Sequence, residues 1–214
     1  HVIPNFVDIK RFHQTDKEHF KQMLAPEGER ILVHVSNFRS VKRVGDVIRI
    51  FDKIRQVIPS KLLMIGDGPD RQNSEELARS LGLYNDVRFL GKQDQISEIL
   101  SISDLFILQS ETASFGLSAL EAMACSVPVI STNAGGLPEI NLEGKTGFMS
   151  NVGDVDAMSH NAIYILSDND RLQHFKKAAI AQARKFEKQH IIPLYEKLYC
   201  EVIAAYKNEK AVIN

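Results

Sequence analysis

The chain contains no tryptophan and only two cysteines, and it has no apolar run close to the ~20 residues that span a bilayer. Cys125 and Cys200 lie far apart in apolar or amphipathic surroundings, so we expect buried or bystander thiols in a reducing, cytoplasmic compartment. The net charge of −1 implies no polyanionic partner, so nucleic acid is not an expected ligand. These absences exclude a disulfide-rich secreted domain and a transmembrane protein.

Metal and triad motifs are absent from the sequence as well. The seven histidines are scattered, and no cluster of His and Cys has metal-site spacing. The stretch "GLSAL" fails the G-x-S-x-G pattern because its last position is Leu120. The chain opens on "HVIPNFVD" without an initiator Met or a signal-peptide pattern, so we expect residues 1–214 to be one domain, a fragment from the second half of a longer protein.

The middle of the chain alternates apolar strands with amphipathic helices. Continuous apolar runs of this kind, joined by short connections, are typical of a parallel sheet covered by helices on both faces. The sequence therefore predicts an α/β, Rossmann-like fold. The expected strands lie in 30–38, 61–70, 87–91, 104–110, 127–132 and 146–150, and the expected helices are 44–58, 71–82, 94–103, 116–125, 154–167, 170–187 and 191–207.

Ligands bind open parallel sheets beyond the carboxyl ends of the strands, so the loops that follow the strands are expected to form one rim. The first loop contains Arg39, Lys42 and Arg43, which could hold phosphate oxygens or could simply form a solvated basic turn. In the second loop, Gly66 and Gly68 would allow close backbone approach to a ligand, although a tight turn explains them equally well.

The dinucleotide fingerprint G-x-G-x-x-G is not met in that second loop, because Arg71 occupies the position of the third glycine. A Rossmann dehydrogenase that binds NAD is therefore a weaker alternative. Gly91 and Lys92, after the third strand, could present backbone groups to the edge of a base.

Phe115 and Gly116 open a helix whose free N–H groups attract anions. Glu121, inside that helix, could accept two hydrogen bonds from a sugar diol, or could form an ion pair at a helix edge. Gly135 and Gly136 follow the fifth strand and could form a flexible corner or an ordinary capped loop.

Several motifs occur in an order that resembles the C-terminal half of retaining glycosyltransferases of family 4, which have the GT-B architecture. They are "IPNFVD", "SNFRSVKR", "MIGDGPDR", "VRFLGK", "SETASFGLSALEAMACSVPVI", "NAGGLPEI" and "GKTGFM". The likeness extends over nearly the whole chain, and the "SNFR-VKR" wording resembles members of the family that act in bacillithiol synthesis.

The resemblance implies that the chain binds a UDP-sugar donor and that the whole protein transfers a hexosamine, with GlcNAc as the candidate, to a small acceptor such as L-malate with retention. Arg39 and either Lys42 or Arg43 would clamp the diphosphate without a metal or other cofactor. Backbone near Gly91 and Lys92 would face uracil.

The remaining implied contacts lie around the helix at 116–125. The amides of Phe115, Gly116 and Leu117 would meet the phosphate or the sugar, and Glu121 would accept the ribose hydroxyls. The acceptor would bind mostly to a missing N-terminal domain, so the fragment alone would be inactive.

The sequence departs from the family pattern at Ala113. The pattern has two glutamates separated by seven residues, and counting back from Glu121 reaches Ala113, where a glutamate that touches the donor sugar is expected. Glu111 is not an obvious substitute, and Ser126 stands where glycine is usual. A catalytically silent nucleotide-sugar-binding module is therefore the alternative reading.

The C-terminal segment 188–214 has an apolar stripe of Tyr195, Leu198, Tyr199, Val202 and Tyr206 at helical spacing. The resemblance implies that this helix crosses back to the missing domain. In the fragment, part of the stripe would then be exposed or covered by a second copy of the chain in a homodimer.

Overall fold

A single parallel sheet organises the molecule. The computed structural model describes residues 1–213, with side chains described through Tyr206. The strand order is β3-β2-β1-β4-β5-β6, and every neighbouring pair is parallel, which confirms the predicted Rossmann-like fold. The strands are β1 (Arg30–Val35), β2 (Ser60–Ile65), β3 (Val87–Gly91), β4 (Leu105–Leu108), β5 (Val129–Thr132) and β6 (Gly147–Ser150).

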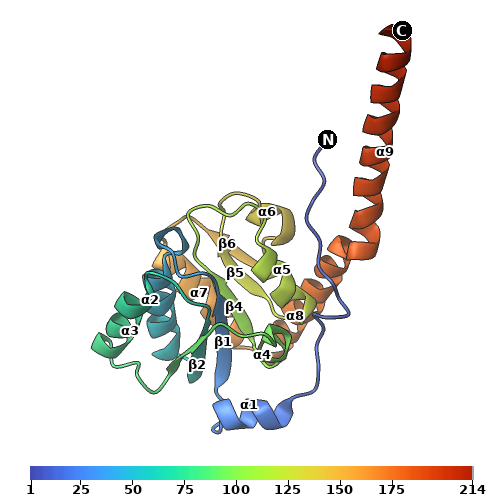
Figure 1. Ribbon diagram of the computed structural model, residues 1–214. Helices are drawn as coiled ribbons and strands as arrows, with labels where there is room; N and C mark the ends of the chain where they lie inside the picture. The colour runs from blue at the N-terminus through green and yellow to red at the C-terminus, as the bar shows by residue number, and fades with distance from the viewer. Residues whose placement is uncertain (214) are drawn as a thin grey trace.

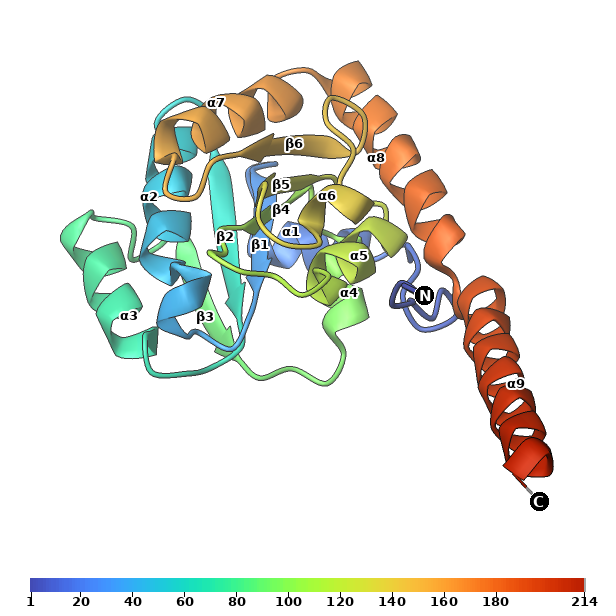
Figure 2. The ribbon, with the colours of Figure 1, turned by 90° about the horizontal axis from the view of Figure 1, so that it is seen from above.

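Helices cover both faces of the sheet, as Figures 1 and 2 show from two directions. One face is covered by α2 (Val44–Arg55), α3 (Arg71–Ser80) and α7 (Val155–Leu166), and the other by α4 (Ile96–Ser101) and α5 (Leu117–Ala124). α8 (Asn169–Ala183) contributes to both layers, with Leu172 and Phe175 in the first core and Ala179 and Ala183 in the second. Further short helices are η1 (Ser40–Lys42), α6 (Leu137–Ile140) and η2 (Arg184–Phe186).

Alternation along the strands explains the two layers. Ile31 and Val33 of β1 pack into the core on the α5 side, whereas Leu32 between them packs against α2 and α7. Successive side chains of a strand point to opposite faces. Because both faces are buried, most positions are apolar, and this preference produces the continuous apolar runs seen in the sequence.

The helix that precedes the first strand was not predicted. The short helix α1 (Glu18–Leu24) precedes β1, and its N-cap residue, Lys17, makes no side-chain capping bond. α1 is attached to the sheet by Lys21, whose ammonium lies 3.3 Å from Asp104. The predicted helix 170–187 ends earlier than expected, because α8 stops at Ala183 and η2 follows.

The last helix, α9 (Lys188–Ile213), leaves the domain as an arm, and the N-terminal segment runs beside its first half (Figure 1). The Val7 amide donates to Phe186 O (2.9 Å), and the hydroxyl of Tyr195 lies 3.5 Å from Ile3 O. Farther along α9, large side chains are exposed, namely those of Tyr199, Val202, Ile203 and Tyr206. That the helix crosses back to another domain, and that 1–214 is one domain of a longer chain, stay predictions.

No helix within residues 1–213 is both long enough and apolar enough to cross a bilayer.

Candidate functional site

The loops beyond the carboxyl ends of the strands are joined edge to edge by backbone hydrogen bonds. Loop 36–43 accepts at Phe38 O from the Asp70 amide (2.9 Å) of loop 66–70, and at Val41 O from the Glu111 amide (2.9 Å) of loop 109–116. Loop 109–116 in turn accepts at Ala113 O from the Gly136 amide (2.9 Å). The predicted rim is therefore one continuous edge of the molecule.

The centre of this rim lies between β1 and β4, where the strand order reverses direction. The ladder between these strands pairs only Leu32 with Leu105 and Val33 with Phe106. Beyond these pairs β1 continues beside β2, and β4 continues beside β5. The loops that follow part at this topological switch point, which is where open parallel sheets bind ligands.

Lys42 reaches across the switch point. Its ammonium lies 3.4 Å from the hydroxyl of Ser110, at the end of β4, and no carboxylate of the described chain pairs with it. Burial lowers the pKa of Lys42, because partial desolvation disfavours its charged form. Arg39 precedes η1 and is exposed, and its side chain makes no hydrogen bond or ion pair to the residues described. Both cations are therefore available to an anion.

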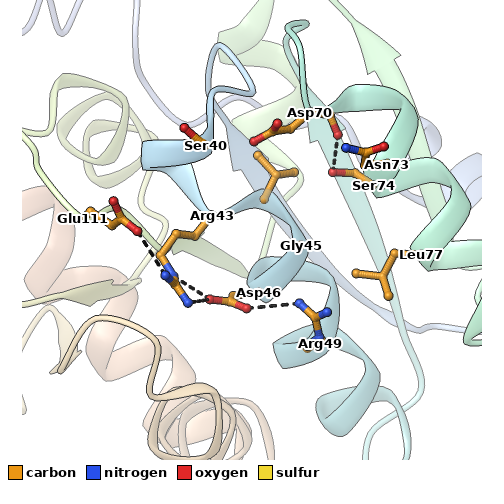
Figure 3. Close-up of a pocket in the computed structure, with 11 residues that line it drawn as sticks. Ser40, Arg43, Gly45, Asp46, Arg49, Asp70, Asn73, Ser74, Leu77 and Glu111 are labelled. Carbon is orange, nitrogen blue, oxygen red and sulfur yellow. Dashed lines mark hydrogen bonds and ion pairs between the residues drawn. The ribbon is translucent and has the colours of Figure 1, made fainter.

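Arg43, unlike Lys42, is surrounded by carboxylates (Figure 3). Its guanidinium bonds Asp46 (2.6 Å) and Glu111 (3.0 Å), and Asp46 also pairs with Arg49 (3.2 Å). These carboxylates raise the pKa of Arg43 further and neutralise its charge, the Glu111 hydrogen bond contributing most.

This ionic chain lines a pocket of about 610 Å³ between α2 and α3, beside the rim. Because its cations are already paired with carboxylates, the pocket is a poor site for a phosphate. The sequence left Lys42 and Arg43 as alternatives for the diphosphate clamp, and this geometry favours Lys42.

Gly66 and Gly68 are needed for contact between loops. A Cβ on Gly66 would lie 1.7 Å from Ser36 O, and a Cβ on Gly68 would lie 2.0 Å from Asn37 O. Gly66 also has φ 119°, in the region that favours glycine. The close approach predicted for these glycines is thus made to loop 36–43 by the protein itself, and their contact with a donor stays a prediction.

Gly91 ends β3 with φ 66°, and its carbonyl accepts from the Gly66 amide (2.8 Å). Lys92 beside it is exposed. The two residues lie on the same rim as Lys42, one strand beyond β2. Their contact with a base stays a prediction.

The start of α5 presents free amides to the rim. Gly116 caps the helix with φ 92°, a left-handed conformation that favours glycine, and a Cβ there would also displace the end of the Leu137 side chain, 2.5 Å away. Among the described residues, the amides of Phe115, Gly116 and Leu117 have no hydrogen-bond acceptor. The ring of Phe115 packs edge-on against Phe186 at 5.7 Å, so only its backbone is available to a ligand.

Glu121 lies one turn into α5 and is partly buried. Within the described chain it makes no hydrogen bond or ion pair. Burial raises the pKa of Glu121 to about 7, and the charge of Arg11 opposes this rise. A carboxylate without a protein donor, on the helix that opens at the rim, is free to accept hydrogen bonds from a ligand.

Ala113 lies in the part of loop 109–116 that packs against Gly135 and Gly136, and its side chain is buried. A Cβ on Gly135 would lie 2.0 Å from Ala113 O, which explains the glycine pair at that corner. Glu111 is committed to Arg43, so within this arrangement it does not replace the missing glutamate.

Sequence reasoning missed two buried polar residues at the switch point. His34 is fully buried in β1 and hydrogen-bonds Ile107 O and the Ser36 hydroxyl. Gln109 is also fully buried, and neither of its amide atoms has a partner in the described chain. The signal for His34 was available, since it is a polar residue in the otherwise apolar strand "RILVHV".

Comparison with known proteins agrees with this fold. Residues 15–182 match the family model described as Glycosyl transferases group 1, so the chain belongs to that family of glycosyltransferases. A curated relative, the N-acetyl-alpha-D-glucosaminyl L-malate synthase of Bacillus anthracis, is 41% identical over 211 residues, which make up 98% of this chain and 55% of the relative. The resemblance seen in the sequence is confirmed. The chain spans about half the length of this relative.

Solved structures of glycosyltransferases share the fold. Sucrose-phosphate synthase from Thermosynechococcus elongatus superposes with a TM-score of 0.87 at 26% identity, covering 96% of this chain and 53% of that one. HepE from Anabaena, solved in complex with UDP-glucose, gives a TM-score of 0.81 at 25% identity over 96% of this chain and 57% of that one. The chain therefore has the fold of one half of a GT-B enzyme.

Proposed function

We propose that this chain is the donor-binding half of a retaining glycosyltransferase, with a UDP-sugar bound along the rim between β1 and β4. The observation behind the proposal is the unneutralised charge of Lys42 at the switch point, with Arg39 on the same loop. A nucleoside diphosphate supplies the anion that these cations lack.

The free amides at the start of α5 support the same placement. An anion at a helix N-terminus is stabilised by unpaired N–H groups and by the helix dipole. Leaving-group charge that develops on UDP as the glycosidic bond breaks would be stabilised by these amides together with Arg39 and Lys42. These cations would act in place of a divalent metal.

The nucleoside end of the donor would lie toward β3 and α5. Glu121 would accept hydrogen bonds from the ribose hydroxyls, and backbone near Gly91 and Lys92 would face the base. HepE, which shares the fold, was solved with UDP-glucose, and this supports a uridine nucleotide as the donor carrier.

The relatives' names support a more specific reaction. The relative from Bacillus anthracis is named as an N-acetylglucosaminyl L-malate synthase, and a 32% identical relative from Niallia circulans is a 2-deoxystreptamine N-acetyl-D-glucosaminyltransferase. We therefore propose GlcNAc as the sugar and a small acceptor such as L-malate, bound mostly outside this chain. Attack on the oxocarbenium-like sugar from the face that UDP leaves would retain the anomeric configuration.

Isothermal calorimetry with UDP tests the diphosphate clamp. Removing either Arg39 (Arg39→Ala) or the Lys42 charge (Lys42→Met) should weaken UDP binding at least about tenfold, because each change deletes a charge-assisted contact worth roughly 1.5–3 kcal/mol. Arg43→Met should have a smaller effect, and Arg79→Ala, which removes an exposed charge on α3, is the matched control. Unchanged affinity in both Arg39→Ala and Lys42→Met would reject the clamp. Because the cations would act in place of a divalent metal, we expect EDTA to leave the affinity for UDP unchanged.

The alternative, a catalytically silent nucleotide-sugar-binding module, is favoured by one observation, Ala113 in place of the expected glutamate. Ala113→Glu in the full-length protein separates the two functions. Transfer from UDP-GlcNAc that appears or rises in this variant supports the enzyme, and UDP binding with no transfer in either form supports the module.

A further inference from the structure

The side chain of His34 bridges the two strands that part at the switch point. Its Nδ1 lies 2.8 Å from Ile107 O of β4, and its Nε2 lies 2.8 Å from the hydroxyl of Ser36, the first residue of loop 36–43. The regular ladder between β1 and β4 ends one residue earlier, at Val33 and Phe106. The imidazole thus makes the last connection between β1 and β4 before the loops begin.

The hydrogen-bond partners define which nitrogen carries the proton. A carbonyl oxygen can only accept, so Nδ1 donates to Ile107 O and Nε2 is left as an acceptor for the Ser36 hydroxyl. Burial, together with the nearby charge of Lys42, lowers the pKa of His34 to about 4 against the opposing effect of the hydrogen bond to Ile107 O, so the ring is neutral at neutral pH. A neutral ring with the hydrogen on Nδ1 satisfies every partner.

The hydrogen bonds continue from the ring into the cationic loop. The hydroxyl of Ser36 donates to His34 and accepts from the Phe38 amide at 3.3 Å. Phe38 has φ 41°, a left-handed conformation that is unusual for a bulky residue. Its ring is fully buried and stacks on His34 with a centroid distance of 6.1 Å. The turn at Phe38 sets the direction in which the chain proceeds to Arg39 and Lys42.

We infer that His34 is a positioning residue for the donor. Its Nδ1-protonated ring holds Ser36 and the left-handed turn at Phe38, and the turn fixes the loop that presents Arg39 and Lys42. His34 touches no ligand itself, and this inference rests on the proposed UDP site.

Two substitutions separate the loop-directed bond from the strand-directed bond. In His34→Gln, the amide reaches the Nε2 position and can accept from Ser36. In His34→Asn, the shorter amide can donate only toward Ile107 O. We expect His34→Gln to bind UDP within about threefold of the unaltered protein and His34→Asn to bind roughly tenfold more weakly, since the loss of a neutral hydrogen bond corresponds to a change of up to about tenfold.

Ser36→Ala provides a second test of UDP binding, which can replace His34→Asn if that variant does not fold. It should weaken UDP binding as much as His34→Asn does, and combining the two should add nothing, because they break the same connection. His160→Asn, on the exposed surface of α7, is the matched control. Equal affinity for UDP in Ser36→Ala and the unaltered protein, or weaker binding by His34→Gln than by His34→Asn, would overturn the inference.

Nitrogen-15 NMR of the ligand-free protein provides a readout that is independent of UDP. We expect a protonated Nδ1 and an unprotonated Nε2 at neutral pH, and Ser36→Ala should shift the Nε2 resonance and the amides of Arg39 and Lys42. A proton on Nε2, or amides that do not move, would reject the positioning role. Failure of the unaltered protein to bind UDP would instead reject the proposed function, and the NMR result would still decide whether His34 controls the loop.

Discussion

At the scale of single residues, the rim contains charged groups that the protein itself leaves uncompensated. Lys42 has a hydroxyl rather than a carboxylate beside it, and Glu121 has no donor in the described chain. A buried charge without a partner destabilises the folded state. Arg43, a neighbour of Lys42 in sequence, is by contrast fully paired with Asp46 and Glu111. The lack of protein partners thus distinguishes the groups that we propose to bind the donor from those that are paired within the fold.

The raised pKa of Glu121 predicts that this residue destabilises the folded state in a pH-dependent way. Its ordinary value is 4.5 and its folded value is about 7, so the folded state binds the proton more tightly than the unfolded state does. The stability of the fold should therefore fall as pH rises from 4.5 to about 7, and the full cost should be present above pH 7. Glu121→Gln should add roughly 1–2 kcal/mol at pH 8, after discounting for partial exposure, and almost nothing at pH 4.

Urea denaturation of Glu121→Gln and the unaltered protein at the two pH values measures this difference. Glu139→Gln, at an exposed carboxyl of α6, is the control and should change stability at neither pH. The same gain for Glu121→Gln at pH 4 and at pH 8 would show that the carboxylate charge is not its cause.

At the scale of elements, a buried carboxylate joins three of them at the end of the sheet opposite the rim. Asp104, just before β4, bonds Lys176 of α8 (2.9 Å), Lys21 of α1 (3.3 Å) and the Ile31 amide of β1 (3.1 Å). Burial alone would raise the pKa of Asp104, but the charges of the two lysines outweigh it and hold the pKa below 3.8.

Asp104→Asn should destabilise the protein by about 3–5 kcal/mol at pH 7, because it leaves two partly buried ammonium groups without their counter-ion. Since the folded pKa is depressed, the contribution of Asp104 is present above pH 3.8 and is lost as pH falls through the folded value. Urea denaturation at pH 7 measures the loss, and Asp170→Asn on the exposed start of α8 is the control. A loss no greater than that of the control would show that the ion triad is dispensable.

The elements also show how far sequence reasoning reaches. All six strands were predicted, because burial on both faces produces a continuous apolar run in the local sequence. α1 was missed because "EHFKQML" is only seven residues long and its N-cap, Lys17, is not a typical capping residue, although Phe20, Met23 and Leu24 stand at helical spacing. Its place depends on the distant contact between Lys21 and Asp104. The choice between Lys42 and Arg43 likewise required the long-range partners Ser110 and Glu111. Contacts between distant parts of the chain cannot be deduced from local pattern.

At the scale of the whole molecule, a compact sheet domain is joined to the projecting arm of α9 (Figure 1). Ile191 is buried near the start of the arm, whereas Tyr199, Val202 and Ile203 are exposed. Helices that bury no face are marginal in water, since most helical stability comes from packing.

Amide hydrogen exchange followed by mass spectrometry should therefore show the arm beyond Tyr199 exchanging much faster than α5, whose Leu120 and Met123 are fully buried. The N-terminal half of α9, which lies beside residues 1–8, should be intermediate. Protection of the far half equal to that of α5 would mean that a second copy of the chain, or another partner, covers it in solution.

The backbone hydrogen bonds between neighbouring rim loops affect which substitutions the fold can accept during evolution. Their main chains are linked amide to carbonyl at Phe38, Val41 and Ala113, so these links do not use the side chains at exposed positions such as Arg39 and Lys92. Substitutions at Arg39 or Lys92 should therefore leave the backbone of the rim intact. Exposed positions on this edge can then change one at a time during evolution without loss of the fold.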